Sequence, residues 1–552
     1  MKKVFGIDLG TTYSCISYID EYGKAVVLKN SDGEHTTPSV VYMDDNGSII
    51  VGNEAKRTIK VEPENTCAFI KRKIGKEGEK ALIAGKEYDP SEVSAWILKK
   101  IVGDANDELR QTGVLNDGEE IKDVVITCPA YFGVSEREAT KTAGELAGLN
   151  VLNIINEPTA AAISYGVSGN EKEETVLVYD LGGGTFDITI MHISGNNIRV
   201  VCTGGDSKLG GKDWDDKLAE YVLGRYEEEL GEDISEDPEI VSELYVNVEV
   251  WKKSLTSREN VKISVNGPAG RFREDLTREK YDEITKINLD RTKNMLDSAL
   301  QVAADRGYPL SKIDKILLVG GSSRMPQVSN MFESDYNIKP VLADPDEAVS
   351  KGAAIFANNE KIYNDFMKEE ADKTGKTVEE VKQENMKNGD LDKKFEQSQL
   401  MGLTGLSKIN ITNVLSRTYG VRYIDGSTYK IQNMLMINDA LPAKRTESFY
   451  TIYDNQHGIS LIIYESLSTE DVINDITDMK PITEVDMRFN QQVPKGTKVE
   501  VTLTLDNSGL LHILASEKLY GNALDTTFQI RNQMSENEKK EALERIKSTK
   551  IG

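Results

Sequence analysis

The sequence predicts a multidomain protein in which a long α/β region precedes a shorter all-β region. Up to about residue 357, short apolar runs alternate with segments of helical spacing. From Val414 to about residue 532, apolar residues recur at every second position, which is typical of half-buried strands. At 552 residues the chain is also too long for one ordinary domain. We expect an α/β domain over 1–357, a charged insertion and interdomain linker over 358–413, a β-sandwich over 414–532 and a short helix over 533–552.

The apolar runs of the first region have the length and composition of strands that are buried on both faces of a sheet. Between two of them, Ser135–Leu149 places alanine and leucine residues at helical spacing, so we expect a helix there. The predicted strands are Val4–Ile7, Ala25–Leu28, Val124–Thr127, Val176–Tyr179 and Ile316–Val319.

Residues 358–408 are highly charged and poor in apolar side chains, which predicts one or two solvated helices or a mobile connector. The tripeptide at 375–377, Gly-Lys-Thr, resembles the end of a phosphate-binding loop. Position 370 is Glu370 instead of the glycine that such a loop needs, and no apolar strand precedes it, so we attribute the match to chance. In the β region, Val499 to Leu505 alternates apolar and polar residues, and we expect seven or eight such strands.

The composition excludes several classes of function. A net charge of −24 repels phosphate backbones and anionic lipids, so neither nucleic acid nor a membrane is an expected partner. The four cysteines form no CxxC pair, which indicates reduced thiols and no metal site. Because no long apolar run and no apolar signal core are present, we expect a cytoplasmic protein. We also expect a monomer.

One motif occurs twice. Asp8-Leu9-Gly10-Thr11-Thr12 follows the first predicted strand, and a matching segment from Asp180 to Thr185 follows a later strand. In a glycine turn, backbone N–H groups can approach phosphate oxygens without interference from a Cβ atom, and threonine hydroxyls add further donors. An aspartate at the strand end can hold a hydrated Mg²⁺ ion. The repeat therefore predicts a site for a magnesium-bound phosphate compound between two similar halves.

Two further segments could contribute to this site. The turn that begins at Gly320 and reaches Arg324 also follows an apolar strand, and it could enclose a nucleoside or only reverse the chain. Glu157, directly before Pro158, is a candidate general base or water-orienting carboxylate, although a helix N-terminus also favours an acidic residue.

These segments together resemble one known family. GIDLGTTYS, IINEPTAAAISYG, DLGGGTFD, LGGKDWD and LLVGGSSRMP are similar, in order and spacing, to the nucleotide-binding domain of the 70-kDa heat-shock (DnaK-like) chaperones. The resemblance covers about residues 1–357 and resumes, more loosely, over about 414–532. It implies an actin-like (ribonuclease H-like) duplicated ATPase domain, followed by a β-sandwich that binds peptides. The implied activity is hydrolysis of ATP to ADP and phosphate, with Mg²⁺ and K⁺ as cofactors.

The resemblance also implies a role for each matching residue. For the metal and the chemistry, these are Asp8 and Asp180 for Mg²⁺, with Lys71, Glu157, Asp180, Thr185 and Asp187 as catalytic residues. The phosphate loops would be Gly10, Thr11, Thr12 and Tyr13, and then Gly182, Gly183, Gly184 and Thr185. Nucleoside contacts would come from Glu249, Lys252, Lys253, Thr256, Gly320, Gly321, Ser322, Arg324 and Asp346. Pro129 and Arg137 match the coupling switch, and Ile424, Phe449, Ile452, Ile459 and Leu461 match the peptide pocket.

The chain departs from the family pattern at several positions. The interdomain linker, normally a run of leucines closed by an aspartate, is here Ile409–Asn413, and the arginine that pairs with that aspartate is Asn153. Replacing both charges keeps this contact neutral. Lys253 stands where an arginine usually stacks on adenine, which predicts weaker nucleotide binding. A charged insertion precedes the linker, and one short helix follows the β region where the family has a helical lid.

The implied partners are unfolded or extended apolar polypeptides, a J-domain co-chaperone and a nucleotide exchange factor. Because the family's docking arginine is Asn153, the usual mode of J-domain docking is in question. Two alternatives remain open: a small-molecule kinase on the same duplicated core, and an actin-like filament or scaffold protein. A specialised chaperone with a single client is a narrower form of the chaperone hypothesis.

Overall fold

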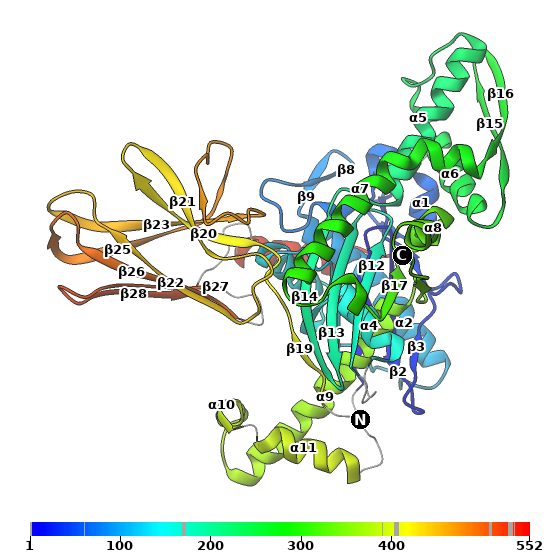
Figure 1. Cartoon of the computed structure of the whole chain (residues 1–552). Helices are drawn as coiled ribbons and strands as arrows, with labels where there is room; N and C mark the ends of the chain where they lie inside the picture. Colours follow the sequence, from blue (N-terminus) through cyan, green and yellow to red (C-terminus); the bar gives the residue numbers. More distant parts are fainter. Residues whose placement is uncertain are drawn as a thin grey trace.

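The fold is described from a computed structural model that covers residues 3–59, 61–167, 173–388, 390–401, 408–506, 511–527, 534 and 536–552. Its first part is built on two six-stranded sheets, and its second part is an all-β unit that projects to one side (Figure 1). In spatial order, the first sheet contains β11 (Asn150–Asn156), β10 (Asp123–Cys128), β1 (Phe5–Asp8), β2 (Tyr13–Ile19) and β3 (Ala25–Val27), with β4 (Thr37–Pro38) beside β2. The second contains β18 (Val341–Leu342), β17 (Lys315–Val319), β12 (Glu174–Leu181), β13 (Phe186–Ser194), β14 (Asn197–Asp206) and β19 (Asn410–Thr412).

The two sheets repeat one arrangement. In each, a central strand (β1 or β12) forms an antiparallel hairpin with the next strand and runs parallel to a later strand. The repeat extends to the register: Asp8 pairs with Cys15 across one hairpin, and Asp180 pairs with Asp187 across the other. The sequence repeat is therefore also a structural repeat, and the two motifs occupy equivalent strand ends.

Two helices lie between the sheets. They are α4 (Glu157–Ala162), continued by η3 (Ile163–Val167), and α9 (Ala348–Thr374), and their alanine-rich faces join apolar side chains from both sheets in one core. At Gly352 of α9, an added Cβ would lie 1.7 Å from the carbonyl oxygen of Ala160 on α4. The close crossing of these helices sets the distance between the two sheets.

The outer faces of both sheets are covered by further helices. Helices α2 and α3 cover the first sheet, and α5, α6, α7 and α8 form the core over the second. Helix α2 begins at Pro90 after Asp89, whose side chain accepts a hydrogen bond from the N–H of Ser91 at 2.9 Å. The bounds are α1 (Asn53–Thr58), α2 (Pro90–Gln111), α3 (Val134–Leu146), α5 (Gly211–Leu230), α6 (Pro238–Ser257), α7 (Arg278–Asp305) and α8 (Pro326–Asp335).

Smaller elements surround these layers. The short helical turns are η1 (Pro63–Asn65), η2 (Ile70–Arg72), η4 (Leu310–Lys312) and η5 (Gly321–Arg324). The small sheets are β6 (Ile49–Val51), β5 (Val41–Met43) and β7 (Thr66–Cys67), then β8 (Ala81–Ile83) with β9 (Lys86–Tyr88), and β15 (Asn260–Gly267) with β16 (Gly270–Thr277).

The charged insertion folds as helices with a small core of its own. Helix α9 runs without a break through position 357, where the first domain was predicted to end, and α10 (Val378–Asn388) and α11 (Asp390–Met401) pack against its second half. Tyr363 and Phe395 meet edge to face, with ring centroids 5.2 Å apart. Gly375 ends α9 in the left-handed conformation, so the Gly-Lys-Thr segment serves here as a helix end.

The C-terminal β region is a sandwich of two antiparallel sheets around one apolar core. The five-stranded sheet contains β24 (Val472–Ile473), β21 (Thr428–Leu435), β20 (Thr418–Asp425), β23 (Gln456–Ser466) and β25 (Pro481–Val493). The four-stranded sheet contains β22 (Ala443–Tyr450), β26 (Lys498–Leu505), β27 (Leu511–Glu517) and β28 (Asn522–Thr527). This is slightly more strands than the seven or eight predicted, and the end of the predicted β domain, 528–532, lies outside the described residues.

The predicted linker and the predicted C-terminal helix both pack on the first domain. Residues of the predicted linker form β19, which adds in parallel to the edge strand β14. Helix α12 (Glu536–Ser548) packs on α2 and α3, and Arg545 pairs with the fully buried Glu92 at 2.7 Å. The backbone N–H of Ile49 in β6 donates to the carbonyl of Lys550 at 2.9 Å.

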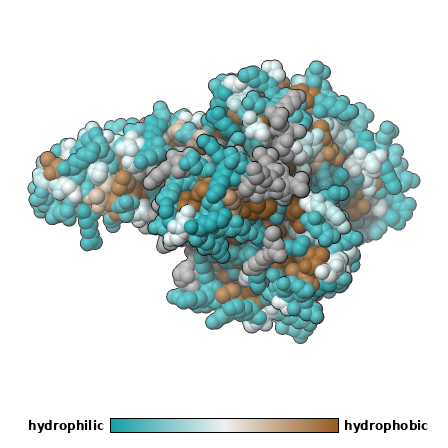
Figure 2. All heavy atoms as spheres, turned by 90° about the horizontal axis from the view of Figure 1, so that it is seen from below, coloured by the Kyte–Doolittle hydropathy of each residue, from teal (hydrophilic) through white to brown (hydrophobic). Residues whose placement is uncertain are grey.

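The surface seen in Figure 2 is largely hydrophilic, with small separate apolar areas. None of the helices in the described part of the chain combines the length and the apolar character needed to cross a bilayer.

We predict that Gly352→Ala destabilises the first domain by about 3 kcal/mol, because the new methyl group must displace the backbone of α4. The matched control is Gly103→Ala in α2, where no atom lies within 4 Å of the added Cβ. The control should be neutral or stabilising by up to about 1 kcal/mol. Urea unfolding of both variants tests this, and equal stabilities would contradict the role given to the α4–α9 crossing.

Candidate functional site

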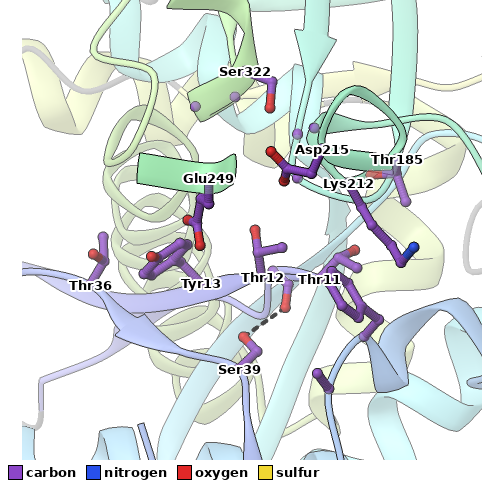
Figure 3. Close-up of a pocket in the computed structure, with 18 of the residues that line it drawn as sticks. Thr11, Thr12, Tyr13, Thr36, Ser39, Thr185, Lys212, Asp215, Glu249 and Ser322 are labelled. Atoms are coloured by element: carbon purple, nitrogen blue, oxygen red, sulfur yellow. Dashed lines mark hydrogen bonds between the residues drawn. The ribbon is translucent and has the colours of Figure 1, made fainter. Parts of the chain in front are cut away.

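A cavity of about 1150 Å³ lies between the two halves of the first domain, and both copies of the repeated motif line it (Figure 3). The cavity brings together most of the residues predicted for a nucleotide and a metal. They are Asp8, Gly10, Thr11, Thr12, Tyr13, Lys71, Glu157, Asp180, Gly182, Gly183, Thr185, Glu249, Lys252, Lys253, Thr256, Gly320, Gly321, Ser322, Arg324 and Asp346. Gly184 and Asp187 are not among the lining residues.

The two glycine turns face each other in direct contact. An added Cβ on Gly183 would lie 2.4 Å from the side chain of Thr12, and one on Gly184 would lie 2.5 Å from Thr11. A Cβ on Gly10 would lie 1.9 Å from the carbonyl oxygen of Tyr13, so this turn also requires glycine. The fit leaves backbone N–H groups and threonine hydroxyls at the inner end of the cavity, which suits a phosphate chain.

Carboxylates outnumber cations at this inner end. Lys71 and Glu157 form a buried ion pair, and Thr127 donates a hydrogen bond to Asp8 at 3.0 Å. Burial and the charge of Glu157 raise the pKa of Asp8 to about 7, against the opposing effect of Lys71. The same two causes hold the pKa of Asp180 well above its ordinary value.

Asp187 lies behind the cavity surface and is 1% exposed. Its carboxylate accepts a hydrogen bond from the backbone N–H of Ala130 at 3.1 Å, and burial together with Glu157 raises its pKa well above the ordinary value. Together with Asp8, Asp180 and Glu157 it surrounds the single ammonium of Lys71. Such a site gains charge compensation from a bound cation, so these residues fit Mg²⁺ or K⁺.

A metal ion held directly by the protein would need several ligating side chains close together. Across the described ranges, no three His, Cys, Asp or Glu side chains are placed so that they could hold an ion directly. Magnesium usually retains several of its waters and uses one or two carboxylates together with substrate phosphates. The arrangement of Asp8 and Asp180 is compatible with that mode of binding.

The outer end of the cavity has its own polar network. Lys252 donates to the carbonyl of Gly211 at 2.9 Å and to Asp215 at 2.8 Å. Burial raises the pKa of Asp215 to about 6, although Lys252 opposes this effect. Arg324 donates to the carboxylate of Asp346 at the cavity mouth. These groups leave mixed donors and acceptors around a space large enough for a nucleoside.

A second network spans the cavity from one half to the other. Lys56 lies 2.8 Å from one oxygen of Glu249, and Lys253 lies 2.8 Å from the other. Lys56 also donates to the hydroxyl of Tyr13 at 2.8 Å. Burial opposes the ionisation of Glu249, but the two lysines outweigh it and lower its pKa to about 2.

Sequence reasoning missed several residues that line the cavity, among them Lys56, Lys212 and Asp215. Asp215 is the last residue of the LGGKDWD segment, and its place one turn into α5 beside the second glycine turn was the available signal. Lys56 had no comparable signal, because it reaches Tyr13 and Glu249 only through the fold.

The two predicted coupling residues lie between the cavity and the β domain. Arg137 of α3 donates to the carbonyl of Phe132 at 3.2 Å and to the side chain of Asn156, the neighbour of Glu157. The amide of Asn156 reaches that of Asn413 in the linker at 3.5 Å. The carbonyl of Pro129 accepts a hydrogen bond from the N–H of Phe132 at 3.2 Å.

The five predicted peptide contacts are not equally accessible. Leu461 is 3% exposed and belongs to the β-domain core, and Phe449 and Ile459 are partly buried against that core. Ile424 and Ile452 are half-buried. None of the five lines the cavity described above.

Comparison with known families shows to which family the chain belongs. The sequence model of one family, described as Hsp70 protein, matches residues 4–84, 78–365 and 397–550. The chain belongs to the Hsp70 family. Hsp70 proteins are ATPases that bind ATP or ADP with Mg²⁺, and they act as ATP-dependent chaperones on unfolded peptides together with co-chaperones. The unmatched stretch, 366–396, is the end of α9, all of α10 and the first half of α11.

We predict that Lys56→Ala speeds nucleotide release about 3- to 10-fold. The ion pair between Lys56 and Glu249 closes the two halves over the cavity, and a partly exposed pair contributes about 1 kcal/mol. Stopped-flow release of a fluorescent ADP analogue measures the rate. The control is Lys24→Ala, which changes an exposed lysine on the same half. Equal release rates for the two variants would show that the Lys56–Glu249 ion pair does not hold the halves closed.

Proposed function

We propose that this Hsp70 protein captures extended apolar peptide segments reversibly, and that ATP hydrolysis in the cavity controls the affinity of its β domain for them. The main support is the cavity itself. Two glycine turns from equivalent halves meet face to face there, with buried carboxylates and the buried Lys71 beside them.

The residues of this chain would act chiefly by positioning and by charge. The turns at Gly10–Tyr13 and Gly182–Thr185 would hold the phosphates, and Lys71 would stabilise negative charge that develops on the transferred phosphoryl group. Glu157, already paired with Lys71, would orient the attacking water. Mg²⁺ beside Asp8 and Asp180, with K⁺ nearby, would neutralise the phosphate charge.

The nucleoside would lie at the outer end of the cavity. Its ribose and base would contact Glu249, Lys252, Lys253 and Ser322, together with the neighbouring residues of the predicted set. Lys253 is engaged by Glu249 and lies 5.4 Å from the centre of the Tyr13 ring. A lysine held in this way offers a nucleobase less stacking surface than arginine does, so we expect modest nucleotide affinity.

Coupling to the β domain would follow the contacts that leave the cavity. A change at Glu157 reaches Asn156 along the backbone, then Arg137 and the carbonyl of Phe132. The same carbonyl accepts a hydrogen bond from the hydroxyl of Ser416, the third residue of the predicted β domain, at 3.0 Å. Through Pro129 and Arg137, the nucleotide state of the cavity would thus favour either docking or release of the β domain.

The kinase and filament alternatives leave the docked β domain without a role. We expect a monomer that works in the cytoplasm with a nucleotide exchange factor. A J-domain partner would have to dock without the usual arginine, because Asn153 stands at that position.

We predict that Lys71→Ala lowers kcat for ATP hydrolysis about 100- to 1000-fold, since it removes the buried cation that faces Asp8, Asp180 and Glu157. Lys73→Ala, an exposed lysine two residues further on, should hydrolyse ATP at the wild-type rate. Steady-state phosphate release, with and without an unfolded peptide, provides the measurement. Wild-type protein without magnesium-dependent ATP binding would overturn the proposed function.

A separate prediction concerns the peptide contacts. Ile424→Ser and Ile452→Ser should each weaken binding of an apolar peptide about tenfold, because each removes a partly exposed apolar contact. Leu461→Ala should instead lower the stability of the β domain by about 2–5 kcal/mol, because Leu461 lies in its core. Fluorescence anisotropy of a labelled peptide and thermal unfolding separate the two effects. Unchanged affinity in both isoleucine variants would place the peptide elsewhere.

A further inference from the structure

Two glutamates from different domains meet where the β domain docks on the ATPase domain. Glu136 lies on α3 of the ATPase domain, and Glu465 lies on β23 of the β domain. A Cβ added to Gly133, at the start of α3, would lie 2.9 Å from one oxygen of Glu465 and 3.2 Å from an oxygen of Glu136. The two carboxylates therefore converge on the same glycine, and any larger residue there would displace one of them.

This contact is part of an extensive interface. Val134, directly after Gly133, belongs to the apolar core of the β domain. The side-chain oxygen of Asn438 accepts a hydrogen bond from the N–H of Thr203 at 2.9 Å, and its carbonyl accepts one from Arg306. In the docked state the Glu465 side chain is 18% exposed and lies toward Glu136, and separation of the domains would increase its exposure.

Few groups near Glu465 compensate its charge. On its own domain, Arg417 Nε lies 3.3 Å from a carboxylate oxygen of Glu465, and the hydroxyl of Tyr419 donates a hydrogen bond to it. That nitrogen of Arg417 is buried and lacks a well-aligned hydrogen-bond acceptor. The salt bridge therefore stabilises the Glu465 carboxylate only in part.

The ATPase domain contributes charges of both signs to this region. Beside Glu136 lie Lys76 and the phenol of Tyr131, and beside Lys76 lie Lys208 and Glu79. Burial lowers the pKa of Lys76, with Lys208 and Arg417 adding to the effect against the pull of Glu136 and Glu79. The positive charge of Lys76 is thus itself poorly stabilised, and it does little to neutralise Glu136 and Glu465.

Burial and the neighbouring Glu136 raise the pKa of Glu465 to about 7, against the opposing effects of Arg417 and Tyr419. The charge of Glu136 acts on Glu465 only while the domains are docked, and docking adds to its burial. In the separated state, Glu465 beside Arg417 would titrate in the ordinary range of a glutamate.

We propose that docking of the β domain takes up a proton at the Glu136–Glu465 contact, so that mild acidification favours the docked state and a rise in pH favours its release. The shared proton removes the repulsion between two carboxylates that the interface forces together. Proton uptake at this contact acts on the docking equilibrium itself, so it does not depend on ATP hydrolysis.

The sign follows from linkage. The docked state binds more protons than the separated state between the ordinary glutamate range and pH 7. The docking equilibrium constant therefore falls as pH rises through that window and levels off above it. With a docked-state pKa of about 7, the constant should be about tenfold larger at pH 6 than at pH 8.

Small-angle X-ray scattering of the full chain with ADP measures the docked fraction between pH 6 and pH 8, at fixed ionic strength. The temperature is set so that about half of the wild-type molecules are docked at pH 7, where the measurement is most sensitive. We expect Glu465→Gln to remove the pH response and to dock at pH 8 as wild type does at pH 6. Glu470→Gln, at an exposed position on the same domain, should keep the tenfold response.

A wild-type docking constant that does not change with pH would overturn the proposal, and so would a full response in Glu465→Gln. Glu136→Gln tests the pair from the other domain and serves as the main variant if Glu465→Gln does not fold. It should reduce the response several-fold, and an unchanged response would show that Glu136 has no part in it. Because scattering needs no turnover, a chain that docks in this way without hydrolysing ATP would contradict only the proposed function.

Discussion

The close approach of two glycine turns is the constraint on which the first domain depends. Gly183 and Gly184 touch Thr12 and Thr11 so closely that a single methyl group on either glycine would separate the halves. Such contact requires the two sheets to be held at a fixed spacing. The crossing of α4 and α9 at Gly352 provides it, because these helices fill the space between the sheets. Packing far from the cavity therefore decides whether the two glycine turns face each other.

Charge imbalance follows from the same geometry. Bringing equivalent strand ends together places Asp8 and Asp180 side by side, and the β13 partner of Asp180 adds Asp187. Lys71 opposes them from within, but it is already paired with Glu157. The site is thus unfavourable for its own charges until a cation arrives, which makes cation binding and closure of the two halves mutually reinforcing.

The sequence predicted the elements whose signal is local. The strand, aspartate and glycine turn are contiguous in both copies of the motif, so their position and pairing could be inferred before the fold was known. Lys56 was missed because its partners, Tyr13 and Glu249, come from distant segments. Leu461 illustrates a different limit. Its alternating strand pattern identifies a buried face, but does not distinguish a peptide pocket from the core of the sandwich.

The region between the domains was the least predictable. The alternation of Ile409 and Ile411 with polar residues fits a strand as well as a linker, and only the exposed edge of β14 determines which one forms. Similarly, the insertion looked solvated because its apolar residues are sparse. Tyr363 of α9, Val381 of α10 and Phe395 of α11 nevertheless belong to one core.

The interface between the domains uses two chemically different kinds of contact. At the linker, Asn413 meets Asn156 through neutral amides, whose interaction does not change with pH or strongly with salt. At the sandwich, Glu136 and Glu465 meet as ionisable groups, with Arg417 as an incomplete counter-charge. Because the linker contact is next to Glu157, it can respond to the nucleotide, whereas the glutamate contact can respond to protons. Each signal therefore acts on the same docking equilibrium through its own residues, and their free energies add where the two contacts do not touch.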